Sequence, residues 1–431
     1  MDNNTKKKIG LALSGGGYRA AAYHIGTLRA LNKLDILDKV DVISSVSGGS
    51  ITAAYYALNK DNYNKFEQSF ISKLQKGVLL FSILNLILVI GLIAISVWLL
   101  GWWILLLDFV LLFFLWFKLL PFSVWIENAY NKHFFENKKL SDLPNKPLIA
   151  INSTDVATGT LFTFSQIKMA GYKYEGKDKK IVFKHEIFPI ARAVMASSCV
   201  PFAFSPIKIS SKYCDVPFEK GVNKPLLIDG GLYDNQGAHK LTEKSSNYHT
   251  QIIIVSDAGV GEMNTKWAFN IPMMLVKTSN IMMKRIKTFQ FRNNVYTKND
   301  NNDLRFAYLS LEWEVSDRPI RGFVQNIIEG HIAPELFEYH RLSKKDIEDL
   351  QNSDKHTQEI AKEKLIMQLK QHIDWKYLES IKPSQHEHSL AKSVGTNLTA
   401  LNKDKIDALI KHANWLTEVQ VRLYLPYLIH K

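Results

Sequence analysis

The sequence of 431 residues predicts an α/β fold with a mostly parallel central sheet, interrupted by an apolar helical hairpin. Two strand–helix units follow one another within the first sixty residues, which is typical of a parallel sheet covered by helices. Short apolar strands recur after residue 146, and a long segment almost without charge precedes them. A chain of this length can bury a sizeable core.

The predicted elements follow the hydrophobic pattern. The first unit is a strand at 9–13 and a helix at 19–34, in which apolar residues recur at three-residue steps. The second unit is "VDVIS" (40–44) and a helix at 49–58, and a connecting helix is expected at 62–76. Further strands are expected at 147–156, 226–229, 251–257 and 304–315, and helical segments at 273–296, 343–373 and 403–425.

The apolar segment at 78–120 predicts a membrane hairpin. Its only charge before Phe117 is Asp108. One helix of this length would run about 65 Å, roughly twice the hydrocarbon thickness, so two spans at about 78–98 and 102–120 with a turn near Gly101 fit better. Interfacial tryptophans are then expected at both ends: Trp98, Trp102, Trp103, Trp116 and Trp125. A buried helical pair and a shallow re-entrant hairpin are the alternatives.

Charge predicts the partners and the side of the membrane. Lys73 and Lys76 precede the hairpin and Lys118 and Lys132 follow it, so the positive-inside rule places the rest of the chain in the cytoplasm. The N-terminus lacks a signal-peptide pattern, and two cysteines favour a reducing compartment. The net charge of +13 favours anionic headgroups of the bilayer; no nucleic-acid motif is present, so no nucleic-acid partner is expected.

A triple-glycine loop, Gly15, Gly16 and Gly17, lies between the first strand and its helix. Bare glycines let backbone N–H groups converge near the positive end of a helix, which suits either a nucleotide phosphate or an oxyanion. The nucleotide interpretation requires G-x-G-x-x-G and an acid after the second strand, or a P-loop lysine. Neither pattern is present, so the loop is interpreted as an oxyanion hole.

"SSVSGGS" (44–50) follows the second strand and opens the second helix, where a nucleophile elbow of the type G-x-S-x-G would stand. Ser47 is the candidate nucleophile, and Gly48 is a further oxyanion donor. Ser45 replaces the first glycine, but it is small enough for the sharp turn. An ordinary Ser/Gly turn is the alternative, and the glycine loop thirty residues upstream argues against it.

A serine nucleophile needs a base. "LLIDGGLYDNQG" places Asp229 at the end of an apolar strand before two glycines, although a plain Asp–Gly turn has the same pattern. Among the histidines, His239 is nearest to a loop context and His24 is expected within the first helix. Asp234 and Asp257 are interpreted as structural.

Together these motifs resemble the patatin-like phospholipase family, with a G-G-G-x-[RK] loop (15–19), an elbow (45–49) and D-G-G (229–231). "INSTDVATG" (151–159) and "ARAVMASSCVPFAFSPI" (191–207) are also similar to that family. The resemblance covers about residues 9–260. It implies a three-layer sandwich and a Ser–Asp catalytic dyad without histidine, metal or cofactor.

The resemblance also implies roles for individual residues. Ser47 would attack a lipid ester and Asp229 would take its proton, while Gly15, Gly16, Gly17 and Gly48 would hold the oxyanion. Arg19 would order the glycine loop or contact the lipid phosphate. The expected reaction is hydrolysis of phospholipids or lysophospholipids; a neutral-lipid lipase, an acyltransferase and a catalytically weak membrane scaffold are the alternatives.

The predicted organisation has four parts. Residues 1–76 and 127–260 form the catalytic domain, 77–126 the membrane hairpin and 261–431 a mostly helical C-terminal extension. Since the hairpin follows the elbow helix, we expect it to emerge near Ser47 and to place the mouth of the active site against the bilayer.

Overall fold

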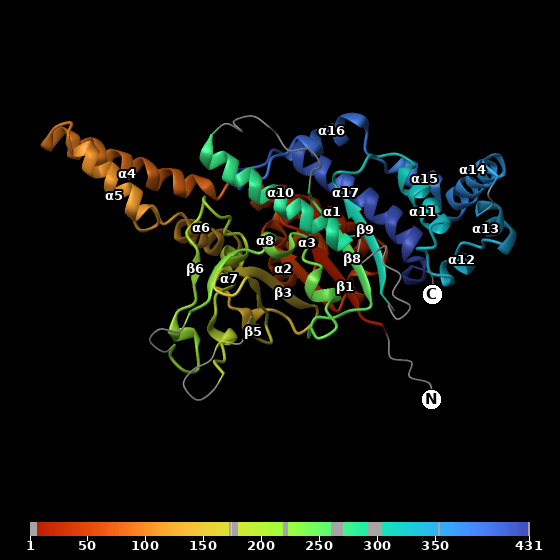
Figure 1. Ribbon diagram of the computed structural model, residues 1–431, viewed down its shortest axis with the longest axis horizontal. Coiled ribbons are helices and arrows are strands. Elements are labelled where there is room, and N and C mark those ends of the chain that lie inside the picture. Colours follow the sequence, from red (N-terminus) through yellow and green to blue (C-terminus); the bar gives the residue numbers. More distant parts are fainter. Residues whose placement is uncertain are drawn as a thin grey trace.

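A computed structural model describes residues 7–171, 174, 180–218, 223–259, 270–291, 304–351 and 354–429. Its centre is one sheet with the strand order β5-β4-β3-β2-β1-β8-β9, and β7 pairs with β3 and β6 (Figure 1). The strands are β1 (Ile9–Leu13), β2 (Val42–Val46), β3 (Leu148–Asp155), β4 (Thr160–Phe164), β5 (Met169–Ala170), β6 (Ile207–Lys208), β7 (Leu226–Asp229), β8 (Ile252–Asp257) and β9 (Arg305–Ser310).

The predicted fold class is confirmed. Strands β3, β2, β1, β8 and β9 are mutually parallel, and β4, β5, β6 and β7 form antiparallel pairs at one side of the sheet. The helices of the first half are α1 (Gly17–Lys33), α2 (Gly48–Asn59), α3 (Tyr63–Leu74), α4 (Leu79–Leu100), α5 (Ile104–Leu119), α6 (Phe122–Tyr130), α7 (Ile190–Ser197), α8 (Gly231–Asp234) and α9 (His239–Thr242).

The second half of the described chain contributes mainly helices. They are α10 (Ile271–Phe291), α11 (Arg318–Ile328), α12 (Glu335–Tyr339), α13 (Lys344–Leu350), α14 (Lys355–His372), α15 (Trp375–Ser380), α16 (Gln385–Ser393) and α17 (Lys403–Tyr424). The predicted helical residues 292–296 lie outside the described part of the chain.

The sheet separates two apolar cores, because alternate residues of a strand face opposite sides. In β1, Leu11 and Leu13 belong to the large core beneath α1, α2 and α17. Ala12, between them, faces a smaller cluster that includes Leu241 of α9 and Tyr308 of β9. All five residues of β1 are buried, which explains why its sequence is an unbroken apolar run.

The C-terminal region shares the core of the catalytic region. β9 pairs in parallel with β8, and α17 packs along α1. Trp415 of α17 is fully buried, and its indole N–H donates to the carbonyl of Leu378. Residues on both sides of the predicted boundary at 260 therefore form one hydrophobic core.

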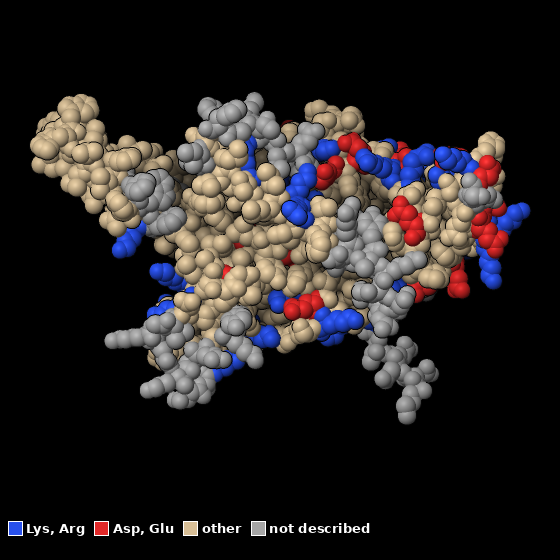
Figure 2. All heavy atoms as spheres, in the orientation of Figure 1, with Lys and Arg blue, Asp and Glu red and all other residues tan. Residues whose placement is uncertain are grey.

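Helices α4 and α5 leave the body as an arm (Figure 1), and the visible face of this arm is almost free of charged side chains (Figure 2). Trp98, Trp102 and Trp103 are more than three-quarters exposed at its tip. The Ser96 hydroxyl of α4 donates to the Asp108 carboxylate of α5 at 3.0 Å. The acidic side chain of the hairpin therefore has a polar partner.

The two helices of the hairpin, α4 and α5, differ in length. Within the described residues, one helix is long and apolar enough to cross a bilayer: the window Ile83–Leu100 of α4 has a mean hydropathy of 2.8 and no buried residue. α5 has 16 residues and therefore rises about 24 Å, which is less than the roughly 30 Å hydrocarbon core.

The contact between α1 and α17 gives a test of this shared core. A Cβ at Gly26 would collide with the backbone carbonyl of Ile410 and with Ala413. We expect Gly26→Ala to lower the free energy of unfolding by about 1–3 kcal/mol, since the two helices must separate. Urea denaturation in mild detergent measures this change.

Gly322→Ala is the matched control, because that helical glycine is exposed and has open space around its Cα. Alanine there should leave stability unchanged or raise it by up to about 1 kcal/mol through helix propensity. Equal unfolding midpoints for Gly26→Ala and Gly322→Ala would contradict the tight helix contact.

Candidate active site

Ser47 occupies a strained turn between β2 and α2. Its φ and ψ are 51° and −121°, a left-handed conformation that a non-glycine residue rarely adopts. A side chain at Gly48 would collide with the backbone of Gly17, and one at Gly49 with the carbonyls of Leu13 and Ser14. The glycines after the serine are thus required by close backbone approach, as expected for a nucleophile elbow.

The strand β3 brings Asp229 to this turn. β2 pairs with residues 148–152 of β3, and β7 pairs in the opposite direction with residues 153–155. Both lie on the edge of β3 away from β4. Val46 ends β2 opposite Asn152, and Asp229 ends β7 opposite Ser153. The two strands therefore meet end to end. This arrangement brings Ser47, which follows β2, close to Asp229, which ends β7.

Burial controls the charge of Asp229. The side chain is nearly inaccessible, with 6% of its residue surface exposed, and Ser47 is 8% exposed. Loss of solvation raises the pKa of Asp229 to about 6, although hydrogen bonds from the Gly231 N–H and the Ser47 side chain lower it. The Gly231 N–H donates to Asp229 Oδ1 at 2.7 Å. The carboxylate is therefore poised to exchange a proton near neutral pH.

Backbone contacts hold the Asp-Gly-Gly turn against the end of α7. The Asp229 N–H donates to the carbonyl of Cys199 at 2.8 Å, and the Gly230 N–H to the carbonyl of Ser197 at 3.3 Å. A Cβ at Gly230 would collide with the carbonyl of Asn152 in β3. The first of the two glycines is thus explained by close packing on the sheet.

A network of buried serines supports the elbow. The Ser47 N–H donates to Ser197 Oγ at 2.9 Å, and Ser197 Oγ donates to the carbonyl of Asn152 at 2.6 Å. Ser50 links Ser197 and Ser45 through hydroxyl contacts of 3.0 and 3.1 Å. Ser45, which stands where the elbow pattern has glycine, also donates to the carbonyl of Ala150. Its hydroxyl is satisfied, so the turn accommodates the extra atoms.

The glycine loop lies beside the elbow, and two of its glycines have positive φ: 144° at Gly16 and 59° at Gly17. The Gly15 N–H donates to the carbonyl of Asn235 at 2.9 Å and so is not directed at a substrate in this conformation. Gly17 and Gly48 begin helices α1 and α2, where N–H groups have no partner within the helix. Within the predicted oxyanion set, the Gly15 N–H is thus engaged by Asn235, whereas Gly17 and Gly48 are the first residues of helices.

Arg19 is a buried residue of α1, with 5% exposure. Its Nη1 donates to the carbonyl of Val394 at 3.2 Å, in the connection between α16 and α17. Burial lowers the pKa of Arg19 to about 10, and the side chain stays cationic at neutral pH. Of the two predicted roles, the position of Arg19 favours ordering of the loop over contact with a lipid phosphate.

Other predicted candidates are engaged elsewhere. His24 is fully buried between Ser256 Oγ and the carbonyl of Ser14, and burial lowers its pKa to about 4. Asp234 accepts from the N–H groups of Gln236 and His239. Within the described residues, no group of three or more His, Cys, Asp or Glu side chains is suited to a metal ion.

Two features that the sequence did not indicate complete the site. Ser197 and Asn235 fix the backbones of Ser47 and Gly15, and neither belongs to a recognised catalytic motif. Ser197 lies in a stretch noted only for its resemblance to the family, and Asn235 follows the Asp-Gly-Gly turn. The place of Asn235 close after Gly230 and Gly231 is a sequence signal for that residue, whereas Ser197 has only the resemblance of its stretch.

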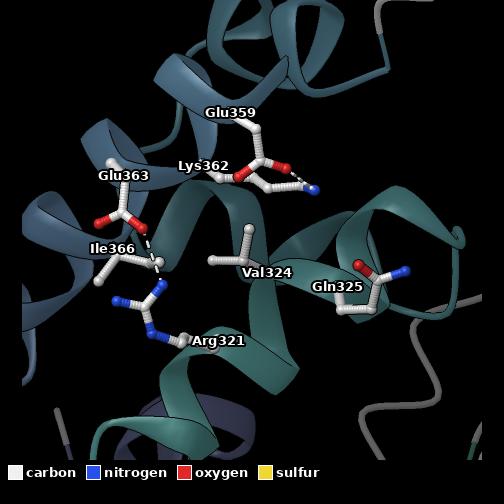
Figure 3. A pocket seen from close by; sticks show the side chains of 7 residues that line it. All are labelled: Arg321, Val324, Gln325, Glu359, Lys362, Glu363 and Ile366. Carbon is white, nitrogen blue, oxygen red and sulfur yellow. Dashed lines mark hydrogen bonds and ion pairs between the residues drawn. The ribbon is translucent and has the colours of Figure 1, made fainter. Parts of the chain in front are cut away.

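A surface pocket of about 230 Å³ lies between α11 and α14 (Figure 3). Its charged side chains pair with one another, Arg321 with Glu363 and Lys362 with Glu359, each at 2.7 Å. None of its lining residues belongs to the predicted catalytic set, so this pocket is separate from the candidate active site.

The strained Ser47 lies directly after a parallel strand and before a helix, the position that a nucleophile elbow occupies in an α/β-hydrolase sheet. The sequence profile "Patatin-like phospholipase" matches residues 11–241, more than half of the chain, and the chain belongs to this family. Members of the family are lipid acyl hydrolases. No curated protein sequence matches the chain significantly.

Comparison with solved structures gives matches at low sequence identity. Human GIVD cytosolic phospholipase A2 matches with a TM-score of 0.50 and 11% identity, over all of this chain and 64% of that one. The chain therefore spans less than two thirds of the length of that enzyme. VipD from Legionella pneumophila matches at 13% identity over 96% of this chain and 92% of its own, with a TM-score of 0.34.

The raised pKa of Asp229 predicts a pH-dependent cost in stability. The folded-state pKa of about 6 exceeds the ordinary value of 3.8, so the folded protein binds the proton more tightly. Stability then falls as pH rises from about 4 to about 6, by about 3 kcal/mol in total. Asp229→Asn stays neutral, so its advantage over wild type in urea denaturation should grow across this pH range.

Ser47→Ala provides a check on the cause. It removes a hydrogen bond that lowers the pKa of Asp229, so the pH range of declining stability should extend upward. A difference between wild type and Asp229→Asn that does not change with pH would show that the carboxyl group titrates normally.

Proposed function

We propose that the protein is a membrane-anchored serine acyl hydrolase that cleaves fatty-acyl esters of phospholipids or lysophospholipids, with Ser47 as nucleophile and Asp229 as base. The observation that carries this proposal is the end-to-end meeting of β2 and β7 along β3, which places a strained serine beside a desolvated carboxylate. The buried Asp229, with its pKa near 6, is matched to proton transfer at neutral pH.

The reaction has two steps on this arrangement. Ser47 Oγ attacks the ester carbonyl carbon while Asp229 takes the hydroxyl proton, and that proton passes to the departing alcohol as the C–O bond breaks. Asp229 then accepts a proton from water as the water oxygen attacks the acyl carbon. That proton passes to Ser47 Oγ as the acyl–Oγ bond breaks, which releases the fatty acid and restores the free serine. No histidine is needed between Ser47 and Asp229, and His24 is committed to Ser14 and Ser256.

The developing oxyanion would be held by backbone N–H groups. Gly16, Gly17 and Gly48 lie at the N-termini of α1 and α2, and the backbones of Gly17 and Gly48 are in direct contact. The positive ends of both helices point to this region. Donors fixed in this way need no reorganisation when charge appears on the carbonyl oxygen.

Membrane anchoring is supported by the surface around the hairpin. The base of the hairpin is rooted in the core, since Val78 and Leu120 are each 4% exposed. The helix that follows it, α6, contacts α7 and the turn beyond it, where Ser123 Oγ donates to the carbonyl of Ser205. The last residue of α7, Ser197, holds the Ser47 backbone, and Cys199 in that turn holds the Asp229 backbone. These contacts support a hairpin that emerges at the active-site end of the sheet.

The surface at this end is apolar in two further places. The turn after α7 exposes Val200 and Phe202. α10, which packs on α8 beside the Asp-Gly-Gly turn, exposes Met274, Ile281 and Phe289. These side chains, with the hairpin, form the surface that we propose to contact the bilayer, so that an acyl chain reaches Ser47 without crossing water.

Active-site substitutions test the dyad. We expect Ser47→Ala to abolish labelling by a fluorophosphonate probe and to lower kcat for phospholipid hydrolysis by about 10⁴-fold or more, with a similar loss for Asp229→Asn. Labelling of the wild type should increase as pH rises through about 6, because the base must be deprotonated. Product analysis by mass spectrometry distinguishes a free fatty acid from a transferred acyl group.

The control for folding is the urea midpoint of each variant. Labelling that persists in Ser47→Ala would place the nucleophile elsewhere. A folded wild-type protein that is neither labelled nor hydrolytic would favour a membrane scaffold over an enzyme.

Replacing residues 79–119 with a flexible Gly/Ser linker tests the docking. Val78 and Leu120 are retained because they are buried. We expect the variant to move to the soluble fraction and to lose turnover of phospholipid in vesicles, while hydrolysis of a soluble short-chain ester remains near the wild-type rate. Equal losses on both substrates would contradict the proposed docking.

A further inference from the structure

The connection between α16 and α17 lies against the proposed oxyanion loop. The carbonyl of Asn397 accepts a hydrogen bond from the Tyr18 N–H at 2.8 Å. A Cβ at Gly17 would collide with the backbone of Asn397, so this glycine is also required by the C-terminal region. Three residues before Asn397, the carbonyl of Val394 accepts from Arg19 Nη1. The loop at 15–19 is thus held from outside the family-matched residues 11–241.

These contacts act on both sides of the proposed donors. The Gly15 N–H donates to Asn235 and the Tyr18 N–H donates to Asn397, at 2.9 and 2.8 Å. Gly16 and Gly17 lie between these two fixed points. Because the peptide planes on either side are held, the backbone of Gly16 and Gly17 has little freedom to rotate.

The side chain of Asn397 sets the direction of its own backbone. Asn397 Oδ1 accepts from the Thr399 N–H at 3.2 Å and from Thr399 Oγ1 at 2.7 Å, a local turn that asparagine forms readily. Four residues after Asn397, the Leu401 N–H donates to the carbonyl of Leu74 at 3.0 Å, at the end of α3. The connection is therefore shaped by Asn397 and anchored beside the base of the hairpin.

We propose that Asn397 is a positioning residue of the active site, which holds the oxyanion loop through the Tyr18 N–H and so aligns the N–H groups of Gly16 and Gly17 with the carbonyl attacked by Ser47. This inference rests on the proposed function. It assigns a catalytic purpose to a segment 350 residues from the nucleophile in sequence.

Asn397→Ala tests the proposal because it removes the turn-forming oxygen and leaves the backbone carbonyl unsupported. We expect kcat for a soluble short-chain ester to fall by about tenfold or more, with KM nearly unchanged, because transition-state donors are misaligned while substrate contacts remain. Asn397→Asp retains an acceptor oxygen for Thr399 and should restore kcat to within about threefold of wild type. Hydrogen exchange at residues 15–19 should be faster in Asn397→Ala and normal in Asn397→Asp.

Asn402→Ala is the matched control. Asn402 caps α17 by accepting from the Lys405 N–H at 3.0 Å, and its loss should cost about 1 kcal/mol of stability without changing kcat. Wild-type kcat in Asn397→Ala, or an equal loss of kcat in Asn402→Ala, would overturn the positioning role. Absence of Ser47-dependent hydrolysis in the wild type would instead overturn the proposed function, and the positioning role with it.

Discussion

The pairing of one strand with two others determines the candidate active site. β3 is longer than β2 and β7, and it holds both along a single edge from opposite directions. Hydrogen-bond register leaves little freedom along a strand, so the end of β2 and the end of β7 meet within one residue of β3. A shift of β7 by a single residue would turn the Asp229 side chain to the other face of the sheet and separate it from Ser47.

The site is built from groups that each reduce stability. Ser47 has a strained backbone conformation, and burial keeps Asp229 from its favoured charged state. Such costs are tolerated where the surroundings leave no alternative. Here the serines at 45, 50 and 197 satisfy one another and fix the turn, while the Gly231 N–H preserves part of the stabilisation of the carboxylate. The same desolvation that costs stability gives the carboxyl group a pKa suited to a base.

The C-terminal third completes this arrangement from the far end of the chain. β9 extends the sheet beyond β8, α17 covers α1, and the connection before α17 contacts the glycine loop. Since α1 begins at that loop, the packing of α17 on α1 and the contact of Asn397 with Tyr18 both fix the position of the same helix end. The described C-terminal residues are thus part of the folding unit that carries the site, and the shared core is the physical reason.

The local sequence pattern was sufficient to predict many of the strands, turns and helices of this protein. Burial of the whole strand explains the apolar run at 9–13, and alternate residues of 226–229 are buried. Close backbone approach explains Gly17, Gly48, Gly49 and Gly230. The strands and the glycine motifs were therefore readable from the sequence. The length of the apolar hairpin was readable as well, but the shortness of α5 was not, because it depends on where the turn at Gly101 ends and where Leu120 enters the core.

Only the tertiary structure decided how these pieces meet. The antiparallel direction of β7, the use of the Gly15 N–H by Asn235, the support of Ser47 by Ser197 and the contact of Asn397 with Tyr18 join residues up to 379 positions apart. Hydrogen bonds of this kind leave no periodicity or spacing in the sequence. The sequence by itself thus determined the chemical groups and the local turns that present them, whereas sheet register and long-range packing determined which of those groups face one another.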